Sequence, residues 1–369
     1  MNSMKLTAKV KLLPTPEQAD LLKSTLETAN AACNYISEQA WEHKTFRQFP
    51  LHKLTYYAVR EHFPLSAQVV VHCISKVADA YKADRRARRT FKLQGAVSFD
   101  NRSLTWRPDK SEVSIWALGG RQSIPYVGGD RQRELLIHQR GESDLALIGG
   151  KFYLFATCDV ETPEPQDVHD VLGCDLGMVN LAVDSDGEQF RGEQVDDNRR
   201  KYEHRRQNLQ RNGSKYAKRK LKKIAGKQAR FQSNTNHVIS KRLVRKAQDT
   251  LRAIALEDLS DLRKAPVRRK QRSKHANWSF YQLRQFIRYK AELAGIPVIF
   301  VDARYTSQTC SVCGGVDKAN RKSQSVFSCV SCGYSANADT NAAVNIAARA
   351  AVNPPMVSTP PGQGQALPL

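Results

Sequence analysis

The chain has 369 residues, with 58 Lys and Arg against 36 Asp and Glu, which gives a formal net charge of +22. A protein this basic is expected to bind polyanions such as nucleic acid, although charge alone leaves open a basic surface that is merely solvated. No run of about 18 apolar residues is present and the first residues lack the apolar core of a signal peptide, so we expect no membrane span and no membrane partner.

The N-terminal part is predicted to contain one strand and two helices. Residues 5–12 alternate polar and apolar side chains, as a half-buried strand does. The sequence TPEQ from Thr15 is a capping box with proline at the first helical position, and apolar residues then recur in steps of three and four as far as Ala40. A second helix is expected over about residues 66–89. It ends in an arginine-rich run that either is solvated or binds a phosphate backbone.

Residues 95–160 change to short strands separated by glycine and Asp/Asn turns. The run RELLIH at residues 133–138 is interpreted as one of these strands. The pattern predicts a small antiparallel β-barrel or sandwich. The strand at residues 5–12 is able to join this sheet, which makes the two helices an insertion. Residues 161–170, rich in proline and acids, are the best domain boundary in the chain.

Strands and helices alternate in the second half. Two apolar strands joined tightly within residues 171–187 are followed by a run, residues 199–223, with twelve Lys or Arg and one acid. A buried strand ending in acids, a helix over about residues 278–294 and a strand at residues 297–302 come next. This order predicts an α/β sheet with some parallel pairing. The tail after Asn353, rich in Pro, Gly and Gln, is expected to be disordered.

Four cysteines near the C-terminus have the spacing of a zinc ribbon: Cys310, Cys313, Cys329 and Cys332. Two residues stand inside each pair and fifteen between the pairs, which suits a tetrahedral structural zinc ion. The remaining cysteines stand singly and are interpreted as small core residues, which favours a reducing, cytoplasmic compartment. They are Cys33, Cys73, Cys158 and Cys174.

Three acids stand in apolar surroundings. Asp175 interrupts a strand, Glu257 or its neighbour Asp258 ends a strand, and Asp339 begins an alanine-rich helix. Each alone is explained by a turn, a strand end or a helix N-cap. Together they suggest a metal site, because buried carboxylates are costly unless they are paired or bound to metal. A pair of magnesium or manganese ions that hydrolyses a phosphodiester accounts for both the acids and the positive charge.

Several segments resemble the successive motifs of the TnpB (OrfB) proteins of insertion sequences: GCDLGMVNLAV, IALEDL, YTSQTCSVCGG and SCGYSANADTNAAVNIAA. Those proteins are RNA-guided DNA endonucleases with a RuvC-like, RNase H-type nuclease domain, and they are related to type V CRISPR effectors. The resemblance is strongest over residues 172–350. It implies that Asp175, Glu257 and Asp339 are the catalytic acids, and it selects Glu257 where spacing alone does not.

The resemblance also implies an α/β plus β-barrel organisation, in which a RuvC-like nuclease domain carries an inserted zinc ribbon and follows a small wedge barrel. The expected parts are a wedge barrel of residues 1–15 and 92–162, a helical recognition insertion of residues 16–91, a nuclease domain of residues 163–304 and 336–352, a target-nucleic-acid-binding ribbon of residues 305–335, and a disordered tail of residues 353–369.

Basic side chains in three runs are expected to contact nucleic acid. They are Arg85, Arg86, Arg88 and Arg89, then Lys201, Arg205, Arg206, Lys215, Lys218, Arg219 and Lys220, and finally Arg268 and Arg269. The basic helices after Arg199 are expected to line a guide–target duplex and to contact phosphates without reading bases. Tyr57, Ser66 and Gln68 are the candidates for reading a short DNA motif.

The expected function is magnesium-dependent cleavage of double-stranded DNA beside a short motif, directed by a guide RNA, in a protein associated with a transposable element. Structural zinc and catalytic magnesium or manganese are the expected cofactors. One protein chain per RNA is favoured, acting on the nucleoid of a prokaryotic cytoplasm. Two alternatives stay open: a transposase or recombinase that performs DNA strand transfer, and a nuclease-inactive regulator that binds RNA or DNA.

Overall fold

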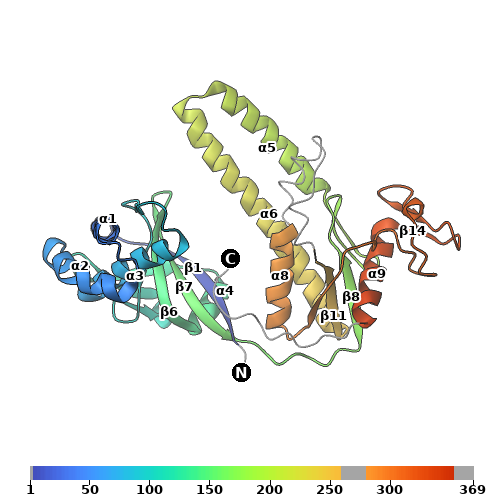
Figure 1. The fold of residues 1–369 in the computed structure, drawn as a ribbon, viewed down its shortest axis with the longest axis horizontal. Coiled ribbons are helices and arrows are strands. Elements are labelled where there is room, and N and C mark those ends of the chain that lie inside the picture. Colours follow the sequence, from blue (N-terminus) through green and yellow to red (C-terminus); the bar gives the residue numbers. More distant parts are fainter. Residues whose placement is uncertain (1–2, 259–279, 353–369) are drawn as a thin grey trace. The chain divides into compact units, whose positions relative to one another are not determined.

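The computed structural model describes residues 3–258 and 280–352. The chain forms two compact units, one made of Ser3–Glu161 and the other of the described residues from Thr162 onward (Figure 1). Within the described ranges, no helix combines the length and the apolar character needed to cross a membrane. Arg268, Arg269 and the tail after residue 352 lie outside the described residues.

Seven antiparallel strands form the sheet of the N-terminal unit, in the order β2-β6-β7-β1-β5-β4-β3. They are β1 (Ser3–Leu12), β2 (Val97–Phe99), β3 (Leu104–Arg107), β4 (Glu112–Ala117), β5 (Gly120–Val127), β6 (Gln139–Ile148) and β7 (Lys151–Glu161). The Trp106 indole of edge strand β3 donates a hydrogen bond of 3.2 Å to Ser143 of β6, which neighbours the other edge strand. The sheet is therefore curled until it is nearly closed, and β1 lies at its centre.

Four helices accompany this sheet: α1 (Pro16–Glu42), α2 (Gln48–His62), α3 (Ala67–Ala83) and α4 (Asp130–Ile137). The capping box at Thr15 opens α1 as its sequence predicts. Helix α3 ends at Ala83, several residues before the predicted end. The reason is Asp84, whose carboxylate accepts the backbone N–H of Arg86 and so competes with further helical bonds.

Two elements differ from the sequence expectations. The run at residues 133–138 is not a strand, because it belongs to α4. There Leu135 and Leu136 are both buried, which strict alternation does not allow, and Asp130 in the first turn favours a helix N-terminus. Helix α2 was not predicted. Its N-cap makes no side-chain hydrogen bond and Pro50 occupies its first turn, where proline is tolerated.

A mixed five-stranded sheet forms the second unit, in the order β10-β9-β8-β11-β12. The strands are β8 (Asp170–Asp175), β9 (Asn180–Asp184), β10 (Gln189–Arg191), β11 (Arg252–Glu257) and β12 (Val298–Val301). Strand β11 is parallel to both β8 and β12. Strand β9 is antiparallel to its two neighbours, β8 and β10. This arrangement is the predicted α/β sheet with partial parallel pairing.

Helices cover both faces of this sheet (Figure 1). Leu172 and Leu256 pack with helices α6 (Lys215–Asp249) and α8 (Phe280–Leu293). The neighbouring residues in each strand face the opposite side of the sheet. Ala255, for example, packs with Ile346 of helix α9 (Ala338–Val352). Period-two alternation in buried strands thus supplies two apolar layers.

Helix α9 lies unusually close to strand β8, and Gly173 is the reason. A Cβ atom at Gly173 would stand 2.0 Å from the carbonyl oxygen of Ala343 and 2.6 Å from the backbone nitrogen of Ala347. Only glycine leaves room for the helix backbone at this point. The alanines of α9 serve the same purpose from the other side, and this contact fixes where the start of α9 stands relative to the end of β8.

Helix α5 (Glu193–Asn212) and the first half of α6 form an antiparallel hairpin that extends away from the sheet (Figure 1). Gly213, with φ of 65°, ends α5, and the Ser214 hydroxyl accepts the Ala217 N–H to begin α6. No residue of α5 is buried. The predicted basic run therefore forms two helices with most of their surface available.

Candidate metal centres and acid site

The four ribbon cysteines converge. Their sulfur atoms all lie within 4.8 Å of one another, with Cys310 and Cys332 3.7 Å apart and Cys313 and Cys329 3.6 Å apart. A short hairpin of β13 (Val326–Ser328) and β14 (Ser335–Asn337) carries the second pair. Four thiols at these distances and in this spacing fit a tetrahedral zinc ion. Among the described residues, no other group of His, Cys, Asp or Glu is placed in this way.

Backbone geometry around the ribbon favours metal binding. Gly314 and Gly333 have φ of 72° and 75° and close the two cysteine turns. Backbone N–H groups of Cys332 and Ser331 bond to the Cys329 sulfur and lower the pKa of that thiol, while contacts with the neighbouring thiols raise the pKa of Cys332, so the cysteines titrate as a coupled group. Asn320 is fully buried; it donates to the carbonyls of Gln308 and Gly315 and accepts the Val330 N–H, so it ties the two halves of the ribbon together.

Two of the three acids end neighbouring parallel strands. Leu256 of β11 pairs with Cys174 of β8, and Glu257 and Asp175 are the next residues along the two strands. Parallel strands bring their carboxyl ends to one edge of a sheet, so these two carboxylates stand at the same edge. The Thr306 hydroxyl, which is 3% exposed, donates a hydrogen bond to Glu257.

The third acid, Asp339, lies in the first turn of α9 and is 6% exposed. One of its carboxylate oxygens accepts a hydrogen bond of 2.9 Å from the Asn180 amide of β9. The other forms an ion pair of 3.1 Å with Arg321, a residue of the cysteine ribbon. Asp339 is therefore oriented by one group from the sheet and one from the ribbon.

The charges of Glu257 and Asp339 both act on Asp175. Burial raises the pKa of Asp175 to about 7, with further increases from the charges of Glu257 and Asp339 and a decrease from Arg321. Burial also raises the pKa of Glu257, against the Thr306 hydrogen bond and the charges of Arg349 and Arg321. Negative charge in excess of the nearby cations is what a divalent ion compensates. The donor set, carboxylates only, fits magnesium or manganese.

The carboxylates do not form a ready-made metal cage. Within the described parts of the chain only the cysteine group meets that condition, and both Asp339 oxygens already have partners. A divalent ion that binds Asp339 through the same oxygen therefore competes with Arg321. The charge of the site therefore fits a divalent ion, but its carboxylates are not placed together as ready ligands.

Asn180, Thr306 and Arg321 are site residues that the sequence analysis missed. Each lies inside a quoted motif or the ribbon, yet a single polar residue in such a segment carries no pattern that distinguishes it from a surface residue. Arg321 is the clearest case, because seven residues stand between it and the nearest following cysteine, Cys329, with nothing to mark it. Only the fold brings its guanidinium to Asp339.

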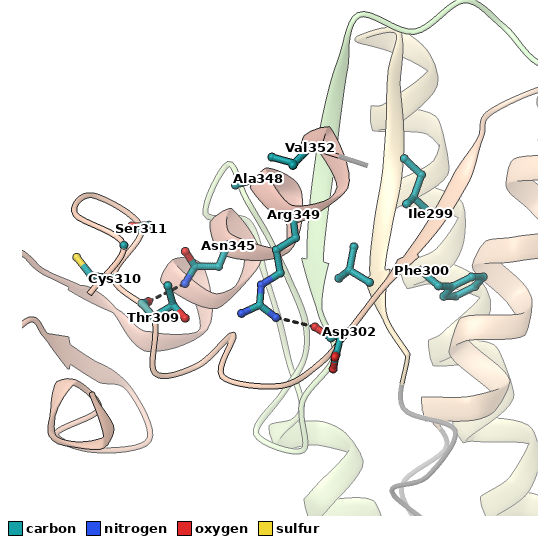
Figure 2. Close-up of a pocket in the computed structure, with 12 residues that line it drawn as sticks. Ile299, Phe300, Asp302, Thr309, Cys310, Ser311, Asn345, Ala348, Arg349 and Val352 are labelled. Carbon is teal, nitrogen blue, oxygen red and sulfur yellow. Dashed lines mark hydrogen bonds between the residues drawn. The ribbon is translucent and has the colours of Figure 1, made fainter. Parts of the chain in front are cut away.

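The second unit contains a cavity of about 510 Å³ (Figure 2). Strand β12, the start of the ribbon and helix α9 line it. The Arg349 guanidinium donates to the backbone carbonyls of Asp302 and Arg304, both at 2.7 Å, and Asn345 donates to Thr309 at 2.7 Å. Because Arg349 and Asp302 both influence the pKa of Glu257, the cavity stands within electrostatic reach of the acids.

Comparison with known proteins agrees with these features. The OrfB family model, described as "Probable transposase", matches residues 155–261, and a "Cas12f1-like, TNB domain" model matches residues 280–346. The CRISPR-associated endodeoxyribonuclease Cas12f1 of Sulfoacidibacillus thermotolerans is 38% identical over 53% of this chain and 50% of its own length. The putative RNA-guided DNA endonuclease InsQ of Escherichia coli K12 is 30% identical over 54% of each chain.

These matches make the chain similar to TnpB-like proteins and to the related type V effectors over parts of its length. It spans about half the length of the curated relatives that it matches. The fold is also similar to the protein in a structure of a Cas12f1–sgRNA–target DNA complex, with a TM-score of 0.60 at 16% identity over 90% of this chain and 83% of that one.

The basic residues expected to contact nucleic acid are distributed over both units. Arg85, Arg86, Arg88 and Arg89 follow α3, where all but Arg85 pair with Asp84 or Glu38. Arg85 stands over the Phe46 ring. On the α5–α6 hairpin, six residues have exposed side chains: Lys201, Arg205, Lys215, Lys218, Arg219 and Lys220. Arg206 is half-buried and donates to Gln228 across the hairpin.

The three motif-reading candidates lie on neighbouring helices. Ser66 is the N-cap of α3, where its hydroxyl accepts the Val69 N–H, and the Gln68 amide contacts His72 at 3.3 Å. Tyr57 lies on α2 and is 82% exposed. The assignment of these residues to a DNA motif stays a prediction.

Proposed function

We propose that the protein is a magnesium-dependent endonuclease, directed by a guide RNA, that cleaves double-stranded DNA beside a short recognition motif and is associated with a transposable element. The observation that carries this proposal is the meeting of Asp175, Glu257 and Asp339 around one edge of the mixed sheet, within the segments that the two family models match.

The second unit fits a RuvC-like nuclease domain. Two adjacent parallel strands end in acids, and a helix on one face of the sheet supplies the third. The ribbon, residues 305–335, stands between β12 and α9 in the chain and returns Arg321 to the acid site. We infer that residues 163–304 and 336–352 form the nuclease domain and that the ribbon contacts the target nucleic acid.

The residues of the site have different roles in the proposed reaction. Asp175, Glu257 and Asp339 would hold divalent ions, while Thr306 and Asn180 orient two of the carboxylates. Such ions would supply activation of the attacking water and stabilisation of the leaving oxygen in phosphodiester hydrolysis. Arg321 keeps a positive charge beside Asp339, which favours approach of a phosphodiester.

The N-terminal unit fits the expected wedge barrel with a helical recognition insertion. Its sheet is interrupted between β1 and β2 by helices α1 to α3, which is the insertion that the sequence implies. We infer that the barrel, the insertion and the α5–α6 hairpin hold the guide RNA and its duplex with target DNA. Exposed cations, such as Lys201 and Arg205 on α5, suit contacts with phosphates rather than bases.

The test begins with purification of the protein from cells that carry its native downstream locus, followed by sequencing of the bound RNA. A single abundant RNA whose end derives from flanking sequence supports guiding, whereas heterogeneous or absent RNA contradicts it. The complex with Mg²⁺ and a matching duplex should then give double-strand breaks. Asp175→Ala should abolish cleavage and keep the RNA, and Asp258→Ala, which changes the adjacent strand-end acid of β11, is the matched control.

Strand transfer is the competing activity, and products distinguish the two. A nuclease yields only broken DNA, while a transposase or recombinase yields joined donor–target molecules. Joined products in the same reaction would overturn the proposal. Retention of RNA with no breaks under any divalent ion would favour the regulator that lacks nuclease activity.

A further inference from the structure

The outer face of helix α2 exposes two large aromatic side chains to solvent. Phe49 is 84% exposed and Tyr57 is 82% exposed, more than any other large apolar side chain among the described residues. The opposite face is ordinary core, since Leu51 and Val59 are fully buried. Helix α2 packs against α3 and α1 and lies outermost among the three helices of the insertion (Figure 1). The packing of α2 on α1 and α3 therefore does not explain the presence of aromatic residues at Phe49 and Tyr57.

The two rings share one side of the helix at a defined spacing. Eight residues at 1.5 Å each place Phe49 and Tyr57 about 12 Å apart along the helix axis, within a quarter turn of each other. Successive bases in a stacked single strand are about 3.4 Å apart, so this distance corresponds to three or four nucleotides. The Tyr57 ring also contacts its neighbours on the helix. The Tyr56 ring meets it edge-on with 5.4 Å between ring centroids, and the His52 ring stacks on Tyr56 with 4.7 Å between centroids.

The charges around the rings favour a polyanion. Lys53 lies between them on the helix and is exposed, and Arg60 is exposed on the next turn. Within α2 the only acid is Glu61. Aromatic faces alternating with cations are what single-stranded nucleic acid binds, since bases stack on rings while phosphates meet the cations. Bases inside an intact duplex are already stacked and do not offer their faces.

We propose that the exposed face of α2, through Phe49 and Tyr57, is a stacking platform for unpaired bases of the guide RNA. This inference rests on the proposed function, and it gives Tyr57 a different ligand from the DNA motif that the sequence suggests. Each ring takes one base, and Lys53 contacts the intervening phosphates.

The experiment measures binding of the full chain to a 12-nucleotide single-stranded RNA that contains 2-aminopurine, with the corresponding RNA duplex and DNA duplex as comparison probes. Salt is raised until phosphate contacts contribute little. Stacking is worth about 1–3 kcal/mol per base, so Phe49→Ala and Tyr57→Ala should each weaken single-strand binding by about fivefold or more. The fluorescence quenching that reports stacking should decrease, and duplex binding should change less than about twofold.

Two variants control for other effects. Tyr57→Phe keeps the ring and should bind as the wild type does. Ile137→Ala removes another exposed apolar side chain of the same unit, 74% exposed on α4, and should have no effect. Both aromatic residues are at the surface, so the alanine variants should keep the thermal transition of the wild type.

Single-strand binding within twofold of wild type in both alanine variants would overturn the platform. An equal loss on duplex DNA would assign the face to DNA, and loss of binding in Ile137→Ala would show a nonspecific apolar effect; either result also overturns the inference. Failure of the proposed function looks different, because no defined RNA then copurifies with the wild-type chain, whatever the behaviour of α2.

Discussion

Replacing Asp175 by asparagine should make the second unit more stable, because the carboxylate is unfavourable in the folded protein without metal. The amide has nearly the same shape as the carboxylate and no charge to desolvate or to repel Glu257 and Asp339. The pKa of Asp175 rises from 3.8 to about 7, which corresponds to about 4 kcal/mol at 1.36 kcal/mol per pH unit. The side chain keeps some contact with solvent. We therefore expect a gain of about 2–4 kcal/mol for Asp175→Asn.

The effect of pH follows from the direction of the shift. Between pH 3.8 and about 7 the folded protein holds a proton on Asp175 that the unfolded chain has lost, so stability of the wild type falls as pH rises through this window. Above pH 7 the penalty is complete and constant. The advantage of Asp175→Asn should thus be largest at pH 8 and small near pH 4.

Calorimetry at pH 8 and pH 5, with chelator present, measures this difference. For a unit of this size, 1 kcal/mol shifts the transition by about 2–4 °C, so Asp175→Asn should melt at least about 4 °C above wild type at pH 8. Added Mn²⁺ should raise the wild-type transition and leave the variant nearly unchanged. Asp258→Asn is the control, since Asp258 pairs with Arg284 at 3.0 Å and its loss should not stabilise.

An Asp175→Asn protein that melts at or below the wild-type temperature at pH 8 would refute the reasoning. It would show that the carboxylate makes a favourable structural contact, and that burial and repulsion from Glu257 and Asp339 do not dominate its energy. An equal difference in melting temperature between Asp175→Asn and wild type at pH 8 and pH 5 would show that the carboxylate does not titrate within the expected window.

Four further outcomes are expected. Cys310→Ser should lose its zinc and destabilise the ribbon, because metal binding and folding are coupled; unchanged zinc content on elemental analysis would contradict this. Gly173→Ala should prevent α9 from docking on β8 and leave the second unit without a cooperative transition, since its Cβ would stand 2.0 Å from the helix backbone. Arg321→Ala should strengthen Mn²⁺ binding about tenfold in calorimetric titration, because the ion no longer displaces a charged hydrogen bond of about 1.5 kcal/mol to Asp339; weaker binding would show that Arg321 helps to hold the metal site. Affinity for RNA should fall steeply with salt, and Lys218→Ala should lower the slope of log K against log salt by about one; a flat response would mean that the hairpin is merely solvated.

The sequence predicted the elements whose periodicity is strong. The capped helix α1, the central strand β1 and the alternation of strands with helices in the second unit all appear in the structure. Helix α2 escaped prediction because it has no capping side chain and contains Pro50, and α4 was mistaken for a strand because its short apolar run has no length to separate the two periods. Local sequence patterns do not predict secondary structure where tertiary packing determines it.

The candidate site shows a similar division. Acids in apolar segments stand out in a sequence because burial makes them costly, so Asp175, Asp339 and the pair Glu257 and Asp258 could be named without a fold, and the family resemblance selected Glu257. Arg321, Thr306 and Asn180 could not, because nothing local distinguishes a polar residue that bonds an acid from one that faces water. Their partners lie in other segments, and only the packing of α9 and the ribbon on the sheet brings them together.

The close fit of α9 on β8 at Gly173 has a consequence for the order of folding. The acid site needs contacts between segments far apart in the chain, and such contacts form slowly because long loops must close first. The α5–α6 hairpin needs only local contacts, which form early. We therefore expect a newly made chain to form the α5–α6 hairpin before it forms the acid site. Under the proposed function, RNA would then be bound before the acid site has formed.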